Sequence, residues 1–535
     1  MNRIGLLFII VPMIILGCNG SSEPVSLVPP KKPTPPPPIE INKFGAWYGN
    51  SSTGYIGVKA FCHICTHQDF DYQWETDSNN DGTFDHSDSV SFGPIKTIDV
   101  ATFGKRVKLT VANDEVSSPL IKYYAPPEDL IETIYSNAKA FAALKRNGTV
   151  VTWGDPYYGG SLNRDLSDIK RIYSTGGAFA ALNNKGQVFT WGDNTLGANS
   201  SQVSFNSSGV NTIYSNDYAF AALQNDGSVV TWGSANSGGN SSNVDLSRDI
   251  ESIYSNDASF VAIKTDGSVV AWGNSFTGAN LNGVHFNSTV KKVFATDASF
   301  AALLDDGSVV AWGHPDTGGR QPTQINDIVV DIFSNDGAFV ALKNDGSITA
   351  WGHPSYGGVV SQISNVETVV ATKKAFAALR KDGSVITWGD AAHGGNSTGV
   401  DFSGGVTSIS ATKQAFSAVK LNGTVVSWGP ASAGGDSSTI DFSQGVEKLF
   451  TNGHAFFALM KDETVLTWGH PYFGANSSNV DLSNIHSVYA TDTAFAVLKT
   501  NGTVVCFGDS NGGGDLTQAA HQLELKGKEV EYSTP

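Results

Sequence analysis

The stretch from residue 211 to residue 233 holds one complete unit of a pattern that fills most of this chain. It runs Asn211-Thr212-Ile213-Tyr214-Ser215, then Ala219-Phe220-Ala221-Ala222-Leu223, then Asp226-Gly227, and it ends in Ser228-Val229-Val230-Thr231-Trp232-Gly233. Asp-Gly accepts the positive φ angles of a tight hairpin whose twist matches that of its strands. The stretch therefore predicts three short antiparallel strands, over 211–215, 219–223 and 228–232.

The same unit recurs ten times, at intervals of 37 to 41 residues. Each copy ends in an aromatic residue followed by Gly, and these aromatic residues are Trp153, Trp191, Trp232, Trp272, Trp312, Trp351, Trp388, Trp428, Trp468 and Phe507. Nine copies carry a turn pair ending in Gly before the last strand. The ninth copy has Asp462-Glu463 instead, so we expect its hairpin to be strained or longer. Ten copies at this period predict a propeller or solenoid of stacked sheets.

The unit resembles the repeat of the regulator-of-chromosome-condensation family, most clearly in Trp191-Gly192-Asp193-Asn194-Thr195-Leu196-Gly197. In the shortness of its copies it is also similar to the secreted β-lactamase-inhibitor propellers. The resemblance covers residues 131–515 and implies an all-β fold, a β-propeller of about ten short three-stranded repeats. The related propellers have seven copies, so a single ten-bladed ring and a regrouping of the strands are both open.

The last segment, 516–535, contains a sequence similar to the opening strand of another copy. Residues 527–533 would then pair next to copy one or copy ten and close the ring, because an open ring leaves strand edges exposed. The alternative is a loose tail, which is common at chain ends.

Composition agrees with a turn-rich β-protein and excludes several classes. The 535 residues include 58 Gly, and only 16% are charged. The net charge of −16 argues against a nucleic-acid partner, because phosphate binding needs a basic surface. Four Cys are too few for a disulfide-dense scaffold.

Residues 1–17 have the features of an export signal, with Arg3 before an apolar run from Ile4 to Leu16. The run ends in Ile15-Leu16-Gly17-Cys18, which resembles the lipobox of bacterial lipoproteins. The resemblance implies cleavage before Cys18, lipidation of its thiol by fatty acids such as palmitate, and anchoring in a membrane. Asn19 in place of Asp favours the outer membrane or cell surface of the bacterium. An ordinary signal peptide that happens to contain Cys is the alternative.

Residues 18–42 are Pro-rich and predict a stiff tether. A small β-domain is expected over 43–118, and a linker over 119–130. Period-2 strands around Trp74 and over 106–111 make this domain similar to the Ig-like β-sandwich modules of bacterial surface proteins, without their inter-sheet disulfide.

Two polar clusters in this domain suggest further chemistry. Oxygen-bearing side chains follow the spacing of a calcium loop, and the candidate ligands are Asp77, Asn79, Asp81, Thr83, Asp85 and Asp88. A hairpin turn rich in Asp and Asn explains the same residues equally well. Cys62 and Cys65 are expected to form a local disulfide, whereas a zinc site with His67 would lack a fourth ligand. Calcium is thus the one cofactor that the sequence suggests.

Comparing the copies separates scaffold positions, which recur, from positions that vary. Variable aromatic and His residues are the usual anchors of a binding face on a rigid scaffold, although they could instead pack between blades. The candidates are Tyr157, Tyr158, Tyr218, Phe276, Tyr356, His393, His454, Tyr472 and Phe473. His314, His353 and His470 occupy the same position in three separate copies, and Pro follows each of them. This pattern favours a turn role over a metal site.

No catalytic motif is present: the chain has no nucleophile elbow, no HExxH and no phosphate-binding Gly loop. We therefore expect no enzymatic activity and a surface-anchored lipoprotein whose propeller binds another protein, in adhesion, recognition or inhibition. A carbohydrate-binding propeller and an enzyme with an unrecognised site in the central channel are the alternatives.

Overall fold

The computed structural model describes seven strands in the N-terminal part and nearly all of the repeat region. The described residues are 41–47, 56–62, 71–76, 89–92, 95–98, 107–112, 120–124, 130–320, 325, 327–500, 502–517 and 519–523. They fall into two compact units, the N-terminal strands and the repeat region from Ile131 onward, and each is described here by itself.

The N-terminal strands form two antiparallel sheets. The first has the order β1-β2-β5, from β1 (Ile41–Trp47), β2 (Ile56–Cys62) and β5 (Ile95–Ile98). The second has the order β4-β3-β6-β7, from β4 (Ser89–Phe92), β3 (Asp71–Thr76), β6 (Val107–Ala112) and β7 (Leu120–Tyr124). The strands expected around Trp74 and over 106–111 are β3 and β6, which pair with each other. Strand β7 lies inside the segment expected to be a linker, and it pairs with β6.

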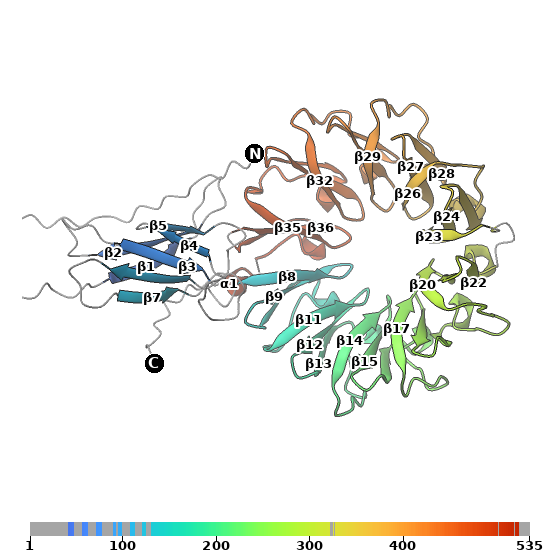
Figure 1. The fold of residues 1–535 in the computed structure, drawn as a ribbon, viewed down its shortest axis with the longest axis horizontal. Helices are drawn as coiled ribbons and strands as arrows, with labels where there is room; N and C mark the ends of the chain where they lie inside the picture. Colours follow the sequence, from blue (N-terminus) through green and yellow to red (C-terminus); the bar gives the residue numbers. More distant parts are fainter. Residues whose placement is uncertain are drawn as a thin grey trace, which may run out of the picture. The chain divides into compact units, whose positions relative to one another are not determined.

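The repeat region forms ten antiparallel sheets of three strands each, and each sheet uses three consecutive strands of the chain. We call these sheets blades 1 to 10 in chain order. They follow one another around a ring (Figure 1). This confirms ten three-stranded repeats in an all-β, propeller-like fold and rules out a regrouping of strands between repeats.

The strands have nearly the same length in every blade. The first strands are β8 (Ile131–Ser136), β11 (Ile169–Ser174), β14 (Val210–Ser215), β17 (Ile250–Ser255), β20 (Val290–Ala295), β23 (Val329–Ser334), β26 (Val366–Ala371), β29 (Val406–Ala411), β32 (Val446–Thr451) and β35 (Ile485–Ala490). The second strands are β9 (Ala140–Lys145), β12 (Ala178–Asn183), β15 (Ala219–Gln224), β18 (Ser259–Lys264), β21 (Ser299–Leu304), β24 (Ala338–Lys343), β27 (Ala375–Arg380), β30 (Phe416–Lys420), β33 (Ala455–Met460) and β36 (Ala494–Lys499). The third strands are β10 (Val150–Gly154), β13 (Val188–Gly192), β16 (Val229–Gly233), β19 (Val269–Gly273), β22 (Val309–Gly313), β25 (Ile348–Gly352), β28 (Val385–Gly389), β31 (Val425–Trp428), β34 (Val465–Gly469) and β37 (Val504–Gly508).

The hairpin of blade 9 keeps the length of the others and is strained. Glu463 occupies the place that Gly takes elsewhere and has a φ of 68°. A side chain with a β-carbon is disfavoured there, because the left-handed region brings that carbon too close to the backbone. The expectation of strain is thus confirmed, and the alternative of a longer hairpin is wrong.

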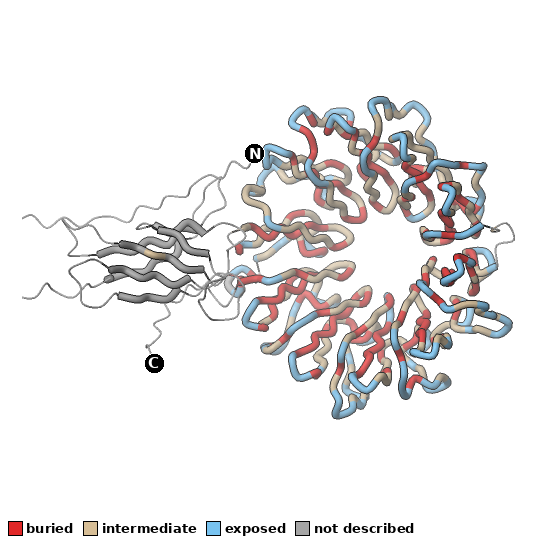
Figure 2. The backbone as a smooth tube through the Cα atoms, viewed as in Figure 1, coloured by how far each residue is buried: buried red, intermediate tan, exposed pale blue. Residues whose placement is uncertain are grey.

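The core lies between neighbouring blades, and the second strands are its centre. In β15, Phe220 and Ala222 pack against blade 2, whereas Ala219, Ala221 and Leu223 pack against blade 4. Buried residues accordingly run along the strands, and exposed residues gather in the loops (Figure 2). The small Ala side chains let adjacent sheets approach closely around each fully buried Phe, as the sequence predicts.

A Trp–Gly hydrogen bond joins most pairs of adjacent blades. In the joint between blades 3 and 4, Trp272 stacks on Phe260 with ring centroids 5.2 Å apart. Its indole N–H donates to the carbonyl of Gly238, with a distance of 3.1 Å. Gly238 has a φ of 98°, and a β-carbon on it would lie 2.5 Å from the Phe260 ring. Only Gly fits this position, so the recurring Trp and Gly are parts of one joint.

The same bond occurs in the eight joints from blade 1 to blade 9, at 3.0–3.1 Å. Both joints of blade 10 lack it. Phe507 has no N–H to donate, and the buried indole nitrogen of Trp153 has no such partner.

Blade 10 nevertheless closes the ring onto blade 1 without exchanging a strand. Asp492 N–H donates to the carbonyl of Ala138 at 3.1 Å, and Phe141 and Trp153 share a core cluster with Leu498. The short helix α1 (Ala520–Leu523) adds Leu523 to this cluster. Residues 527–533, the predicted closing strand, lie outside the described residues.

Candidate functional site

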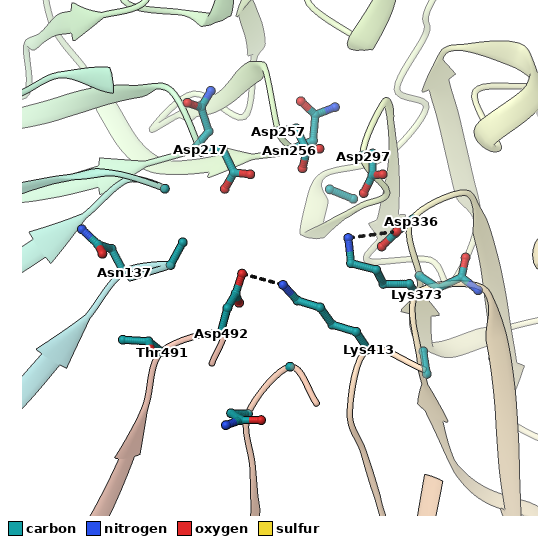
Figure 3. Close-up of a pocket in the computed structure, with 18 of the residues that line it drawn as sticks. Asn137, Asp217, Asn256, Asp257, Asp297, Asp336, Lys373, Lys413, Thr491 and Asp492 are labelled. Atoms are coloured by element: carbon teal, nitrogen blue, oxygen red, sulfur yellow. Dashed lines mark ion pairs between the residues drawn. The ribbon is translucent and has the colours of Figure 1, made fainter. Parts of the chain in front are cut away.

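The turn between the first and second strand of every blade lies on one central cavity of about 1000 Å³. Each blade contributes three consecutive residues to the wall, such as Ser215-Asn216-Asp217 in blade 3 and Ser334-Asn335-Asp336 in blade 6. We call these the inner turns. Figure 3 shows the charged side chains of this cavity and the ion pairs between them.

The second residue of each inner turn is Asn or Thr and has a structural role. In blade 6, the Asn335 amide donates to the carbonyl of Tyr356 at 2.7 Å and its oxygen accepts from Gly337 and Ala338 N–H. Thr175 makes the equivalent hydrogen bonds in blade 2: its hydroxyl donates to the carbonyl of Leu196 and accepts from Ala178 N–H. This residue therefore ties the inner turn to the short 3-10 helix of its own blade.

Backbone hydrogen bonds link the inner turns of successive blades, through the third residue of each turn. Eight of the ten steps around the ring have such a bond, for example Asp297 N–H to Asp336 carbonyl and Lys373 N–H to Lys413 carbonyl. In the described structure no backbone bond joins Asp217 to Asp257, or Asp257 to Asp297. The ring of bonds is thus interrupted on both sides of Asp257.

The third residue varies from blade to blade and gives the cavity its charge. In chain order the residues are Ala138, Gly176, Asp217, Asp257, Asp297, Asp336, Lys373, Lys413, Gly453 and Asp492. Two ion pairs form among them: Lys373 with Asp336 at 3.5 Å, and Lys413 with Asp492 at 2.6 Å. Lys413 reaches blade 10 across Gly453, where a β-carbon would meet the Lys413 side chain at 3.2 Å.

Three carboxylates, those of Asp217, Asp257 and Asp297, have no ion pair among the described residues. Burial, reinforced by Asp217 and Asp336, raises the pKa of Asp257 to about 6. Burial, together with Asp257 and Asp336, raises the pKa of Asp297 to about 7. Burial and the distant Asp492 also raise the pKa of Asp217. Desolvation and like charge both disfavour ionisation, so the pKa values of all three carboxyl groups lie above the ordinary range of Asp.

A 3-10 helix follows the third strand of every blade and lies beside its inner turn. These helices are η1 (Pro156–Tyr158), η2 (Asn194–Leu196), η3 (Ala235–Ser237), η4 (Ser275–Thr277), η5 (Pro315–Thr317), η6 (Pro354–Tyr356), η7 (Ala391–His393), η8 (Ala431–Ala433), η9 (Pro471–Phe473) and η10 (Ser510–Gly512). His314, His353 and His470 are the N-cap residues of η5, η6 and η9. They begin helices in three separate blades, which agrees with a turn role.

The candidate aromatic residues divide into an exposed and a packed group. Tyr157 is 63%, Phe276 77% and Tyr472 79% exposed, and each stands in the middle of its 3-10 helix. Tyr218, next to Asp217, is also exposed. The packed group is partly buried and consists of Tyr158, Tyr356, His393, His454 and Phe473. The exposed rings thus stand at the inner ends of the blades, beside the cavity.

The packed group is held by specific contacts. Lys139 lies over the Tyr158 ring and Lys374 over the Tyr356 ring, both at 5.0 Å. His393 pairs with Asp390 at 2.9 Å. In blade 9, Phe473 stacks on His470 with centroids 4.1 Å apart and also contacts His454. Burial and the charge of Lys413 lower the pKa of His454.

Several sequence-predicted residues lie outside the described residues. They are the lipidation site Cys18, the disulfide candidate Cys65 and the calcium-loop candidates Asp77, Asn79, Asp81, Thr83, Asp85 and Asp88. Cys62 is the last residue of β2. Within the described residues, no three His, Cys, Asp or Glu side chains are placed to hold a metal. No helix in the described part of the chain is long and apolar enough to cross a membrane.

The sequence analysis missed the carboxylates of the inner turns. Their signal was a repeated triplet just before each second strand, a small residue followed by Asn or Thr and then a variable residue, which is Asp in five copies. Asp is also common in the outer hairpins, so its presence alone did not distinguish a cavity wall from an ordinary turn.

Comparisons with known proteins give only distant structural similarity. No family model matches the chain, and no curated protein matches its sequence. Among solved structures, the chain is similar to the ectodomain of the Physcomitrella patens receptor kinase CR4, with 16% identity, a TM-score of 0.32, and coverage of 50% of this chain and 75% of that one. It is also similar to the CRINKLY WD40 ectodomain of the Arabidopsis thaliana receptor kinase ACR4, with 17% identity, a TM-score of 0.30, and coverage of 49% and 98%.

A third similar structure is Kap60 bound to yeast RCC1 (Prp20), with 15% identity, a TM-score of 0.28, and coverage of 49% of this chain and 80% of that one. No function is inferred from these matches.

Proposed function

We propose that this chain is a surface-anchored lipoprotein whose ring binds another protein without catalysing a reaction. The observation that carries the proposal is the set of exposed aromatic residues in the 3-10 helices, Tyr157, Phe276 and Tyr472, beside the central cavity. Large exposed apolar side chains on a rigid scaffold are typical of binding faces. The anchor follows from the lipobox around Cys18.

The scaffold leaves these positions free to vary. Folding needs the Trp–Gly joint and the Asn or Thr of the inner turn, and both recur around the ring. The middle of the 3-10 helix belongs to neither feature, and its residue differs between blades: it is Phe276 in blade 4 and Ser432 in blade 8. Aromatic residues at this position therefore serve contacts outside the chain.

The second candidate is a carbohydrate ligand, because the same exposed rings could stack on sugars. A protein ligand and a carbohydrate ligand can be distinguished by the treatment that destroys each of them. Binding of the full chain to bacterial or host cell surfaces should be lost after protease treatment for a protein ligand, and after periodate treatment for a glycan.

The decisive variant combines Tyr157→Ala, Phe276→Ala and Tyr472→Ala. We expect binding at least about 100-fold weaker, since anchor residues each contribute on the order of 1–2 kcal/mol. Leu421→Ala is the matched control: Leu421 is 76% exposed but lies in a hairpin at the opposite end of its blade. A triple variant that binds as well as the parent would exclude this face as the binding site.

A further inference from the structure

The inner turns of blades 3, 4 and 5 differ from the rest of the ring in two independent ways. The two missing backbone bonds of the inner ring both involve Asp257. The three carboxylates without an ion pair, Asp217, Asp257 and Asp297, belong to these same three blades. One arc of the ring thus lacks its backbone links and carries uncompensated negative charge.

The other half of the ring has both backbone bonds between its inner turns and ion pairs among its charged side chains. From Asp297 through Lys373 to Asp492, every step has a backbone bond between third residues. The carboxylates of Asp336 and Asp492 face lysines, and the remaining third residues there and in blades 1 and 2 carry no carboxylate. In the described part of the chain, Asp257 thus has neither a backbone bond to its neighbours' third residues nor an ion pair, and Asp217 and Asp297, on either side of it, each have one such backbone bond and no ion pair.

We propose that Asp217, Asp257 and Asp297 form a pH-sensitive joint, which holds blades 3 to 5 together when the carboxyl groups are protonated and loosens this arc when they are ionised. Protonation removes the repulsion between these carboxylates across the two steps around Asp257 that have no backbone bond in the described structure. When all three groups are ionised, only repulsion remains between them.

The groups that face this joint all come from the inner turns. The charges of Asp217, Asp336 and Lys373 act on the pKa of Asp257. The same three charges and that of Asp257 act on the pKa of Asp297. Across the cavity, Lys413 and Asp492 act on Asp217 with opposite signs. Lys373 and Lys413 are each held by another carboxylate, so they only partly offset the charge of the arc (Figure 3).

The sign of the pH dependence follows from the direction of the pKa shifts. The pKa values of Asp257 and Asp297 rise from 3.8 in the unfolded chain to about 6 and about 7 in the folded ring. Their contribution to stability is therefore fully present below about pH 4 and is lost as the pH rises through 6 to 7.

Hydrogen exchange on the full chain tests this joint. Amide protection, corrected for intrinsic exchange, is measured between pH 5 and pH 8. We expect protection of blades 3–5 to fall at least about tenfold relative to blades 7–9, because the release of each bound proton lowers stability over this range. An equal response of the two arcs would overturn the proposal.

Isosteric variants assign the effect to the carboxylates. Asp257→Asn with Asp297→Asn should remove the difference between the arcs, and Asp297→Asn alone should reduce it if the double variant does not fold. Asp306→Asn is the control, because Asp306 lies in the outer hairpin of blade 5, where hydrogen bonds from Ser308 lower its pKa. A pH response that survives removal of both carboxylates, or that disappears in Asp306→Asn, would refute the joint.

Discussion

Replacing Asn335 by Ala should cost much more stability than replacing it by Thr. The Ala variant removes three hydrogen bonds of 2.7–3.0 Å and leaves two buried N–H groups, of Gly337 and Ala338, without an acceptor. An unsatisfied buried donor costs about 1–3 kcal/mol, and a lost bond about 1 kcal/mol. The expected loss in the free energy of unfolding is therefore about 4 kcal/mol.

Thr restores most of these bonds, as the chain itself demonstrates. Thr372, in the equivalent place of blade 7, donates to His393 and accepts from Ala375 N–H at 3.1 Å. We expect Asn335→Thr to lose about 1 kcal/mol, since only the weaker of the two accepted bonds disappears.

Urea unfolding followed by Trp fluorescence measures both losses, provided that the variants and the parent share one slope against urea concentration. The reasoning would be wrong if Ala and Thr shifted the midpoint equally, because the hydrogen bonds would then not be the source of the stability. A loss below about 1 kcal/mol for Ala would have the same meaning, since water would then satisfy the exposed donors.

Three further perturbations address the joints, the hairpins and the anchor. Phe507→Trp should stabilise the ring by about 1 kcal/mol, since the indole can donate to the Gly474 carbonyl as in the other joints; an unchanged urea midpoint would refute this. Glu463→Gly should raise the midpoint by the equivalent of about 1 kcal/mol, because Gly accepts the φ of 68° without strain. Cys18→Ser should abolish labelling by fatty acid and release the protein from membranes, and a variant that stays labelled would contradict the lipobox.

The scaffold could be predicted from the sequence because its determinants are local and repeated. The pair Asp226-Gly227 fixes a hairpin by backbone geometry alone, and the small Ala residues beside a large Phe in 219–223 predict a strand packed between neighbouring sheets. Strand β7 pairs with β6, which is close to it in the chain, but it was missed because a polar segment ending in Pro119 precedes it and no Asn-Gly or Asp-Gly pair marks the turn.

The charged cavity could not be predicted in the same way. Asp217 and Asp226 are nine residues apart and both follow a strand end. Asp226 is exposed, and hydrogen bonds from Ser228 lower its pKa, whereas burial raises the pKa of Asp217. The difference arises only when ten inner turns converge, which brings together residues spread over more than 350 positions of the chain. No local pattern in one copy contains that information.

The self-contained blades make the size of this ring easy to change during evolution. Each blade supplies its own three strands, and closure repeats the ordinary contact between neighbours instead of requiring one special pair of ends. Duplication or loss of one gene segment of about 40 codons would then alter the turn between blades only from about 36° to about 33° or 40°. Every such event also adds or removes one third residue of the cavity wall. Selection can therefore adjust the charge of the cavity one blade at a time while the framework stays the same.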